Sequence, residues 1–240
     1  VAYIGAYEYR PESLDEHGTR PREDRDHLNT TLLAVTTSDG DRWDDPIDLG
    51  VPIIPNFGPE PTASGRLIIS GNISFPYTDD PTGLSGWRMT GIYPGAPGGS
   101  FVDDSESFKK LYEVDDRSVP TCEGSFFQTD DGVLHMLLRT NTDRLWVTES
   151  GDDGRTWSEP RPTGFNDNRT KFHFGRLADG RFYYVGSPDP EPRGTRERLV
   201  LSLSDDGTRF DRHLILADGT TQYAQRREGL HKGGDYGYPH

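Results

Sequence analysis

The sequence predicts an all-β protein, and more specifically a β-propeller, from three observations. Short apolar runs of strand length alternate with turn signals, and no helical periodicity is sustained along the chain. The 240 residues include 28 glycines and 18 prolines, a composition typical of a chain rich in turns. One turn motif recurs at spacings near one and two propeller blades of ~40–50 residues, which favours a propeller over a sandwich.

Composition allows a packed core and disfavours several partners. Only 31% of the residues are hydrophobic, but 11% are aromatic, so we expect a core rather than disorder. A formal net charge of −14 disfavours nucleic acid and anionic membranes, which both need a basic surface. No stretch approaches the ~20 apolar residues of a membrane span. The single cysteine, Cys122, cannot form an internal disulfide.

Strand predictions follow in chain order. The first covers residues 1–7, a charged polar stretch follows at 10–29, and further strands are predicted at 31–36, 65–70, 133–138, 181–185 and 199–203. We expect a single domain over residues 1–240, with roughly four blades plus the start of another. The chain begins within a strand without an initiator Met and ends without a closing element, so we expect an incomplete propeller, truncated at both ends. A secreted or periplasmic location is favoured, although no signal region is present in the chain.

The recurring motif is clearest at Ser150–Trp157, which reads Ser-x-Asp-x-Gly-x-Thr-Trp. Asp and Gly favour a hairpin turn, because Asp bonds its own backbone and Gly accepts positive φ. The Thr hydroxyl can bond backbone, and the Trp ring can pack on neighbouring strands. Two degraded copies lie at residues 36–43, which keep Gly40 and Trp43, and at 203–210, which keep Asp205 and Gly207 with Phe210 in place of Trp.

This octet in a propeller resembles the Asp-box, or BNR repeat, of the sialidase superfamily. Asp-boxes are only moderately specific, because they also occur in non-catalytic propellers. In the family they lie on the blade periphery, away from the active site, so we interpret Asp152 and Trp157 as structural. The resemblance implies a six-bladed propeller, and function has to come from other residues.

The segment Ala6–His17 resembles the first strand and following loop of sialidases, where Glu-x-Arg is followed by a loop Asp. That Asp is the family's general acid/base, so the match implies that Asp15 delivers a proton to the leaving oxygen and that Arg10 lies near the pocket. The alternative is a solvated loop, because this segment is a run of mixed charge.

The segment from Thr121 to Thr140 resembles the family most strongly. Sialidases have a Glu at the start of this hairpin and an Arg at the end of its second strand, shortly before an Asp-box. Glu123 and Arg139 occupy those positions, and the Asp-box follows at Ser150. The resemblance implies that Glu123 activates the nucleophile and that Arg139 binds a carboxylate. The alternative is an edge Glu and a strand-end Arg on the surface.

Two later segments complete the resemblance. Sialidases place a carboxylate-binding Arg before a strand such as residues 199–203, and Arg196 matches best, with Arg193 and Arg198 as competitors. The family's Tyr nucleophile follows, with Tyr238 as the best match and Tyr236 as the alternative. His240 follows Pro239 where the family has small residues, and this departure leaves room for a relative in which His240 is catalytic.

Other groups of residues give only weak indications of a metal, cofactor or modification site. The histidines show no metal-ligand spacing and no phosphate loop or dinucleotide fingerprint appears, so we expect neither a metal ion nor a cofactor. Residues 171–176 either line the pocket or form a strand with alternating aromatics, and we favour the strand. Asn168-Arg169-Thr170 fits a glycosylation sequon that is common by chance.

The resemblance therefore predicts an exo-acting glycoside hydrolase that removes a terminal acidic sugar, sialic acid or a relative, with retention through a Tyr nucleophile. Its expected partner is a glycan or oligosaccharide substrate, and the oligomeric state is left open. Two alternatives remain: another carbohydrate-active propeller, such as a polysaccharide lyase or a uronate- or rhamnose-directed glycosidase, and a non-catalytic propeller that binds glycan or protein.

Overall fold

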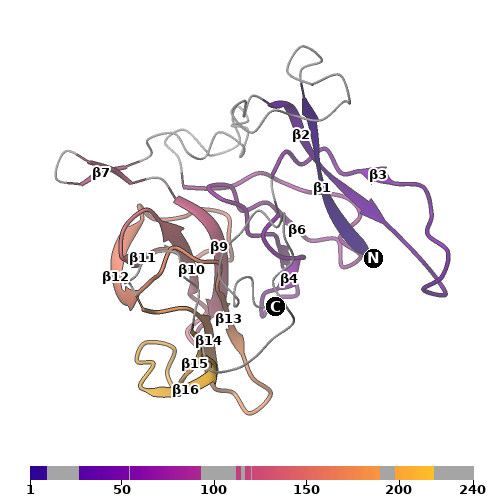
Figure 1. Cartoon of the computed structure of the whole chain (residues 1–240). Coiled ribbons are helices and arrows are strands. Elements are labelled where there is room, and N and C mark those ends of the chain that lie inside the picture. Colours follow the sequence, from indigo (N-terminus) through magenta and orange to yellow (C-terminus); the bar gives the residue numbers. More distant parts are fainter. Residues whose placement is uncertain are drawn as a thin grey trace. The chain divides into compact units, whose positions relative to one another are not determined.

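A computed structural model describes residues 1–9, 27–53, 55–92, 112–114, 117–119, 121–189 and 198–218. These residues form antiparallel sheets and contain no helix, so none of them forms a helix that could span a membrane (Figure 1). The chain groups into two compact units, Val1–Lys109 and Lys110–His240, which are described separately. A single domain over residues 1–240 stays a prediction.

The first unit contains two three-stranded antiparallel sheets. One has the order β1 (Ala2–Tyr9), β2 (His27–Val35), β3 (Ile47–Asp48), and the other has the order β4 (Glu60–Pro61), β5 (Leu67–Ile68), β6 (Tyr77–Thr78). The predicted strand at 65–70 is therefore shorter than expected. A core cluster of Leu32, Val51, Ile53 and Ile69 supports this unit.

The second unit contains two four-stranded antiparallel sheets in which each strand pairs with the next along the chain. The first sheet comprises β9 (Thr121–Gln128), β10 (Leu134–Thr140), β11 (Arg144–Ser150) and β12 (Arg161–Asn166). The second comprises β13 (His173–Arg176), β14 (Phe182–Gly186), β15 (Leu199–Ser204) and β16 (Arg212–Ala217). A hairpin of β7 (Tyr112–Val114) and β8 (Arg117–Val119) precedes them. A four-stranded meander is the blade of a propeller.

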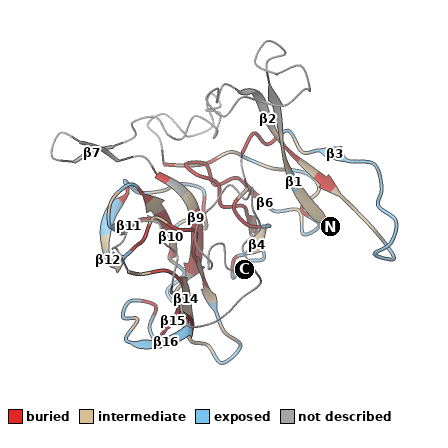
Figure 2. Ribbon diagram, in the orientation of Figure 1, coloured by how far each residue is buried: buried red, intermediate tan, exposed pale blue. Residues whose placement is uncertain are grey.

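The two blades meet along their first strands, β9 and β13. Ser125 on β9 joins them, because its Oγ accepts a 2.9 Å hydrogen bond from the backbone N–H of Phe174. Buried aromatic and aliphatic side chains fill the space between the sheets, namely Phe127, Leu137, Leu145, Val147, Phe172, Phe174, Phe182 and Tyr184. Figure 2 shows buried residues on the inner strands and mostly exposed ones on β12 and β16. The predicted strand at residues 171–176 is confirmed over 173–176, which form β13 with Phe174 buried between less buried neighbours, while Phe172 is buried just before the strand.

All three Asp-box copies occupy the same place in their sheets, the connection between the last two strands. The copy at Ser150–Trp157 joins β11 to β12, the copy at residues 203–210 joins β15 to β16, and the copy at 36–43 joins β2 to β3. The motif therefore forms the last turn of these three sheets.

Hydrogen bonds show that the Asp-box aspartate is structural. Asp152 Oδ1 accepts from the N–H groups of Arg155 and Thr156 at 3.0 and 2.9 Å, and its Oδ2 accepts from the Thr156 hydroxyl at 2.6 Å. Burial would raise the pKa of Asp152, but these bonds and one from Ser150 lower it below its usual value. Asp153 supplies an extra residue at φ 62°, followed by Gly154 at φ 80°.

The third copy corrects the register expected from the sequence. Asp206, not Asp205, accepts the N–H groups of Thr208 and Arg209, at 2.8 and 2.9 Å. Asp205 instead pairs with Arg212 at 2.9 Å. This copy lacks the extra residue that Asp153 provides, so the capping aspartate directly precedes the glycine. In the first copy Asp39 precedes Gly40 in the same way, and Trp43 is 51% exposed rather than packed.

Candidate functional site

The strands of the second unit run between two ends of the blades, and the two ends differ in the turns and side chains that they carry. The Asp-box end carries both Asp-boxes and the hairpins at 129–133 and 177–181, and an ion pair of 2.6 Å between Asp130 and Arg176 links its two blades. The opposite end, called the Glu123 end below, contains the start of β9, the end of β10 and the connection from β12 to β13. The strongest pair of predicted site residues, Glu123 and Arg139, therefore lies away from the Asp-boxes, as the resemblance implies.

Glu123 occupies a β-bulge. On β10, Leu138 pairs with Gly124 and Arg139 pairs with Cys122, so Glu123 is the extra residue of β9. Its backbone has φ 48°, the left-handed region that costs a non-glycine residue about 1 kcal/mol. Bulges of this kind re-aim side chains and are common next to functional sites.

The bulge brings Glu123 and Arg139 together. Nη1 of Arg139 donates a hydrogen bond to Oε2 of Glu123, and the two side chains are only 23% and 16% exposed. Half-buried ion pairs of this geometry are stronger than exposed ones, because less water screens them. A guanidinium has five N–H donors, so Arg139 can hold Glu123 and still contact a carboxylate ligand.

A polar connection, residues 167–171, follows β12 at the same end of the blades as this pair. The Asp167 N–H donates to the carbonyl of Asp143 at 3.0 Å, and the Asn168 N–H donates to the carbonyl of Ser187 at 3.1 Å. Arg169, at φ 56°, donates from Nη2 to the carbonyl of Asn141. These bonds hold the connection to the β10–β11 turn and to the end of β14, so its position is fixed on both sides.

Asp167 is the chemically unusual group of this connection. Its residue is 1% exposed, and Oδ2 has no hydrogen-bond partner among the described residues. Burial raises the pKa of Asp167 to about 7, although the N–H groups of Thr170 and Arg169 and the positive charge of Arg139 oppose this, and the charge of Glu123 adds to it. Glu123, Arg139 and Asp167 therefore lie within electrostatic reach of one another.

Further buried polar atoms surround Asp167. Within the described ranges, four of them lack a hydrogen-bond partner: Arg169 Nε, Thr170 Oγ1, Tyr184 Oη and Ser187 Oγ. Burial, and then the charges of Asp167 and Asp189, raise the pKa of Tyr184 well above its usual value. Unpaired buried polar groups are rare in folded proteins and often mark functional sites.

Most of the other predicted site residues cannot be placed. Asp15, Arg10, Arg196, Tyr236, Tyr238 and His240 lie outside the described residues. The structure brings Glu123 and Arg139 together and does not test the rest of the predicted set. No cluster of three or more potential metal ligands occurs in the part of the chain that the structure describes.

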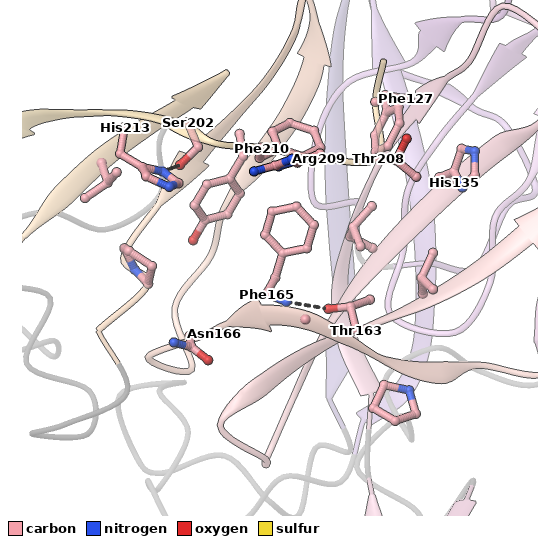
Figure 3. A pocket seen from close by; sticks show the side chains of 18 of the residues that line it. Phe127, His135, Thr163, Phe165, Asn166, Ser202, Thr208, Arg209, Phe210 and His213 are labelled. Atoms are coloured by element: carbon pink, nitrogen blue, oxygen red, sulfur yellow. Dashed lines mark hydrogen bonds between the residues drawn. The ribbon is translucent and has the colours of Figure 1, made fainter. Parts of the chain in front are cut away.

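A groove of about 910 Å³ lies between the two blades, but it does not include Glu123 or Arg139. Figure 3 shows Phe165 and Phe210 in its middle, with His135 on one side and His213 on the other. The rings of Phe165 and Phe210 pack edge to face at 5.1 Å. His135 bonds Glu149 at 3.0 Å, and His213 bonds Ser202 at 2.9 Å. These two histidines are thus held by partners at the groove, which Tyr184 also lines.

Comparison with known proteins decides the family. The model of a family described as a BNR repeat-like domain matches residues 21–240. The chain belongs to this family. No curated protein matches it significantly.

Solved structures similar to this BNR repeat-like chain include several sialidases. A mutant of the NanB sialidase from Streptococcus pneumoniae matches with a TM-score of 0.54 and 18% identity, over 78% of this chain and 29% of that one. The sialidase Hz136, described as a Hadza microbial sialidase, matches with 0.58 and 17%, over 79% and 37%. A protein of unknown function from Dyadobacter fermentans matches with 0.57 and 17%, over 90% and 61%.

These similarities confirm the predicted fold, a β-propeller of the sialidase type. At so low a sequence identity, these similarities show the fold and do not show the activity. The BNR repeat-like chain spans about a third of the length of the sialidases that it matches, 29% and 37% in the two cases above. Activity and substrate are therefore argued from the site.

Sequence reasoning missed Asp167 and its connection. The available signal was a polar run of six residues, 166–171, of which Asn168-Arg169-Thr170 was interpreted only as a sequon that is common by chance. Polar runs between strands are usually solvated loops. Only the tertiary packing shows that this one is buried.

Proposed function

We propose that this protein is an exo-acting glycoside hydrolase of the sialidase type, which removes a terminal acidic sugar from glycans with retention of configuration. The observation that carries the proposal is the ion pair of Glu123 and Arg139 on a strained bulge, at the opposite end of the blades from the Asp-boxes. The family and the sialidase-type fold support it.

In this proposal Glu123 activates a tyrosine nucleophile, Tyr238. An unperturbed phenol has a pKa of about 10, so at neutral pH it needs a base beside it. A neutral nucleophile suits a sugar with a carboxylate at its anomeric carbon, because a carboxylate nucleophile would be repelled. Asp15 would protonate the leaving oxygen and later activate water.

Arg139 would hold the sugar carboxylate together with Arg196, with Arg10, Tyr236 and His240 lining the pocket. The planar guanidinium binds a carboxylate in a bidentate way. The Glu123 end carries the cations Arg139, Arg169 and the buried Lys171, together with the carboxyl groups of Glu123, Asp143, Asp167 and Asp189.

Release of a fluorogenic aglycone from a sialoside by the full chain tests the proposal. We expect turnover in the wild type, and a loss of at least about 100-fold in kcat for Y238F and for E123Q, because each removes one half of the activated nucleophile. Y236F tells the two candidate nucleophiles apart and should lose less activity than Y238F, because Tyr236 only lines the pocket in this proposal. Proton NMR of the first product anomer should show retention of configuration.

Other outcomes would support the alternatives. A product that absorbs in the ultraviolet, made from a uronate-containing polysaccharide, would identify a lyase that uses Tyr238 and His240. Glycan binding that survives both Tyr238→Phe and Asp15→Ala, without turnover of any glycoside, would identify a binding propeller and contradict the hydrolase.

A further inference from the structure

The groove between the two blades of the second unit has the size of a ligand site. Its volume is about 910 Å³, and ligand pockets in proteins usually measure about 300–1,000 Å³. On the side of β16, His213 and Ile215 line it, together with Ser202 and Val200, the residues with which they pair on β15. Leu214, between them on β16, is not part of the lining, as the alternation of a strand requires.

Aromatic rings lie in the middle of this groove. Phe165 comes from β12 and Phe210 from the Asp-box turn after β15, and both are only partly buried (Figure 3). Ile215, on the same groove, is 60% exposed. The face of an aromatic ring carries partial negative charge and attracts groups with partial positive charge, such as the C–H groups of a sugar ring. The groove therefore offers an open apolar surface for a ligand with a C–H face.

Polar groups beside these rings can bond a ligand. Tyr184 forms part of the buried wall, and its Oη has no hydrogen-bond partner among the described residues. Its ring lies 5.8 Å from that of Phe165. A buried hydroxyl without a partner is destabilising, so a ligand that supplies a partner gains affinity. His213 bonds Ser202 through Nδ1 at 2.9 Å, which leaves Nε2 for a ligand. A phenol hydroxyl and a neutral imidazole can each donate or accept.

The charged groups of the groove are already paired. Arg161 pairs with Glu149 at 2.8 Å, and Arg198 pairs with Asp189 at 2.9 Å. An acidic ligand would have to compete with these carboxylates for the guanidinium groups. A wholly apolar ligand would leave the hydroxyl of Tyr184 without a partner. The lining therefore suits a neutral ligand that has both an apolar face and hydroxyl groups.

We propose that this groove binds a neutral oligosaccharide. The C–H face of one sugar ring packs on Phe165 and Phe210, and the sugar hydroxyls bond Tyr184 and His213. The site is separate from the ion pair of the proposed active site, because neither member of that pair lines the groove. The inference goes beyond the proposed function and does not depend on it.

Saturation-transfer NMR of the full chain tests this inference. The probes are five neutral sugars, namely lactose, maltotriose, cellotriose, chitotriose and mannotriose, with toluene as an apolar probe. We expect at least one sugar to receive saturation and to bind with a Kd of about 1 mM or tighter in calorimetric titration. Saturation of none of the sugars, or of toluene alone, would overturn the inference.

Variants then place the bound sugar. F210A should weaken its affinity by at least about tenfold, because the stacking surface is lost. H213A should weaken it about fivefold, because one hydrogen bond is lost. Y184F should weaken it by a similar factor without lowering the Tm, because the hydroxyl has no partner to lose in the free protein. Should F210A not fold, H213A and Y184F still carry the test.

Two controls complete the experiment. L214A is the matched control for H213A, because Leu214 is the next residue on β16, is 52% exposed and does not line the groove. It should bind the sugar as the wild type does, and so should R139Q. Affinity that is unchanged in both H213A and Y184F, or that falls equally in L214A, would overturn the inference. A loss in R139Q alone would place the sugar at the proposed active site and would also overturn it. None of these outcomes decides whether the protein cleaves sialosides.

Discussion

The guanidinium of Arg139 donates a hydrogen bond to the carboxylate of Glu123 across a β-bulge, and Glu123 reaches this position in a left-handed backbone conformation. In a regular antiparallel ladder, neighbouring residues of β9 would point to opposite faces of the sheet. The bulge interrupts this alternation. Local strain at Glu123 thus places a carboxylate beside a guanidinium near the end of the blade.

Two substitutions of Glu123 distinguish the effect of backbone strain on stability from the effect of the carboxylate on activity. Glu123→Gly and Glu123→Ala both remove the carboxylate, but only glycine adopts φ 48° without a steric cost. We expect E123G to be more stable than E123A by about 1 kcal/mol in urea unfolding. Both should lose glycosidase activity by at least about 100-fold. An E123A variant that matches E123G in stability would show that the backbone is not strained.

Asp167 makes stability depend on pH in a direction opposite to that of most aspartates. Its pKa is raised to about 7 in the folded state and lies near 3.8 in the unfolded chain, so the folded state binds more protons between these values. Stability is fully present below pH 3.8, falls as the pH rises, and reaches a constant loss above pH 7. The loss is at most about 4 kcal/mol, because each pKa unit corresponds to ~1.4 kcal/mol.

Asp167→Asn removes this dependence while keeping the size of the side chain. We expect the free energy of unfolding of D167N, relative to the wild type, to increase from pH 4 to pH 7 and to stay level above it. Urea unfolding at several pH values measures the difference. A constant difference across this range would mean that Asp167 is ionised throughout, and would contradict the burial argument.

The features predictable from sequence were those set by neighbouring residues. Turn chemistry and blade spacing gave the all-β propeller, because Asp, Gly and Thr act within a few residues of one another. The order of Glu123, Arg139 and the following Asp-box identified the pair. Its bulge could not be predicted, because a bulge depends on the pairing between two strands and not on one strand's composition.

Other features depended on contacts between distant segments. Asp167 follows an exposed edge strand in a polar run, and nothing in that run shows that the carbonyls of Asp143 and Ser187 hold it inside. Its raised pKa is a product of desolvation, which only the packed structure defines. The same holds for the third Asp-box, where two adjacent aspartates are indistinguishable until their hydrogen bonds are known.

These two aspartates give a direct test of the corrected register. Asp206 caps the turn by accepting two N–H groups and the Ser204 hydroxyl, and these bonds hold its pKa far below the usual value. Asp205 makes an exposed ion pair with Arg212, which contributes little. We expect Asp206→Ala to lower the Tm clearly and Asp205→Ala to leave it nearly unchanged. Neither should alter KM, because both lie at the Asp-box end. A reversed order of Tm values would restore the register expected from sequence.

Gly207 and Gly40 occupy the same position in two Asp-boxes, at φ 75° and φ 82°, but their surroundings differ. A Cβ at Gly207 would lie 2.9 Å from Cγ2 of Thr129 and 3.1 Å from the ring of Phe127, whereas a Cβ at Gly40 would meet nothing within 4 Å. Gly40→Ala should therefore carry only the backbone cost of about 1 kcal/mol. Gly207→Ala adds overpacking where the turn meets the core between the blades, and should cost about 2–4 kcal/mol in total. Urea unfolding of the two variants measures the contrast. Equal losses would mean that the turn moves away from Phe127 at little cost, and that the packing of the Asp-box against the neighbouring blade is not what holds it in place.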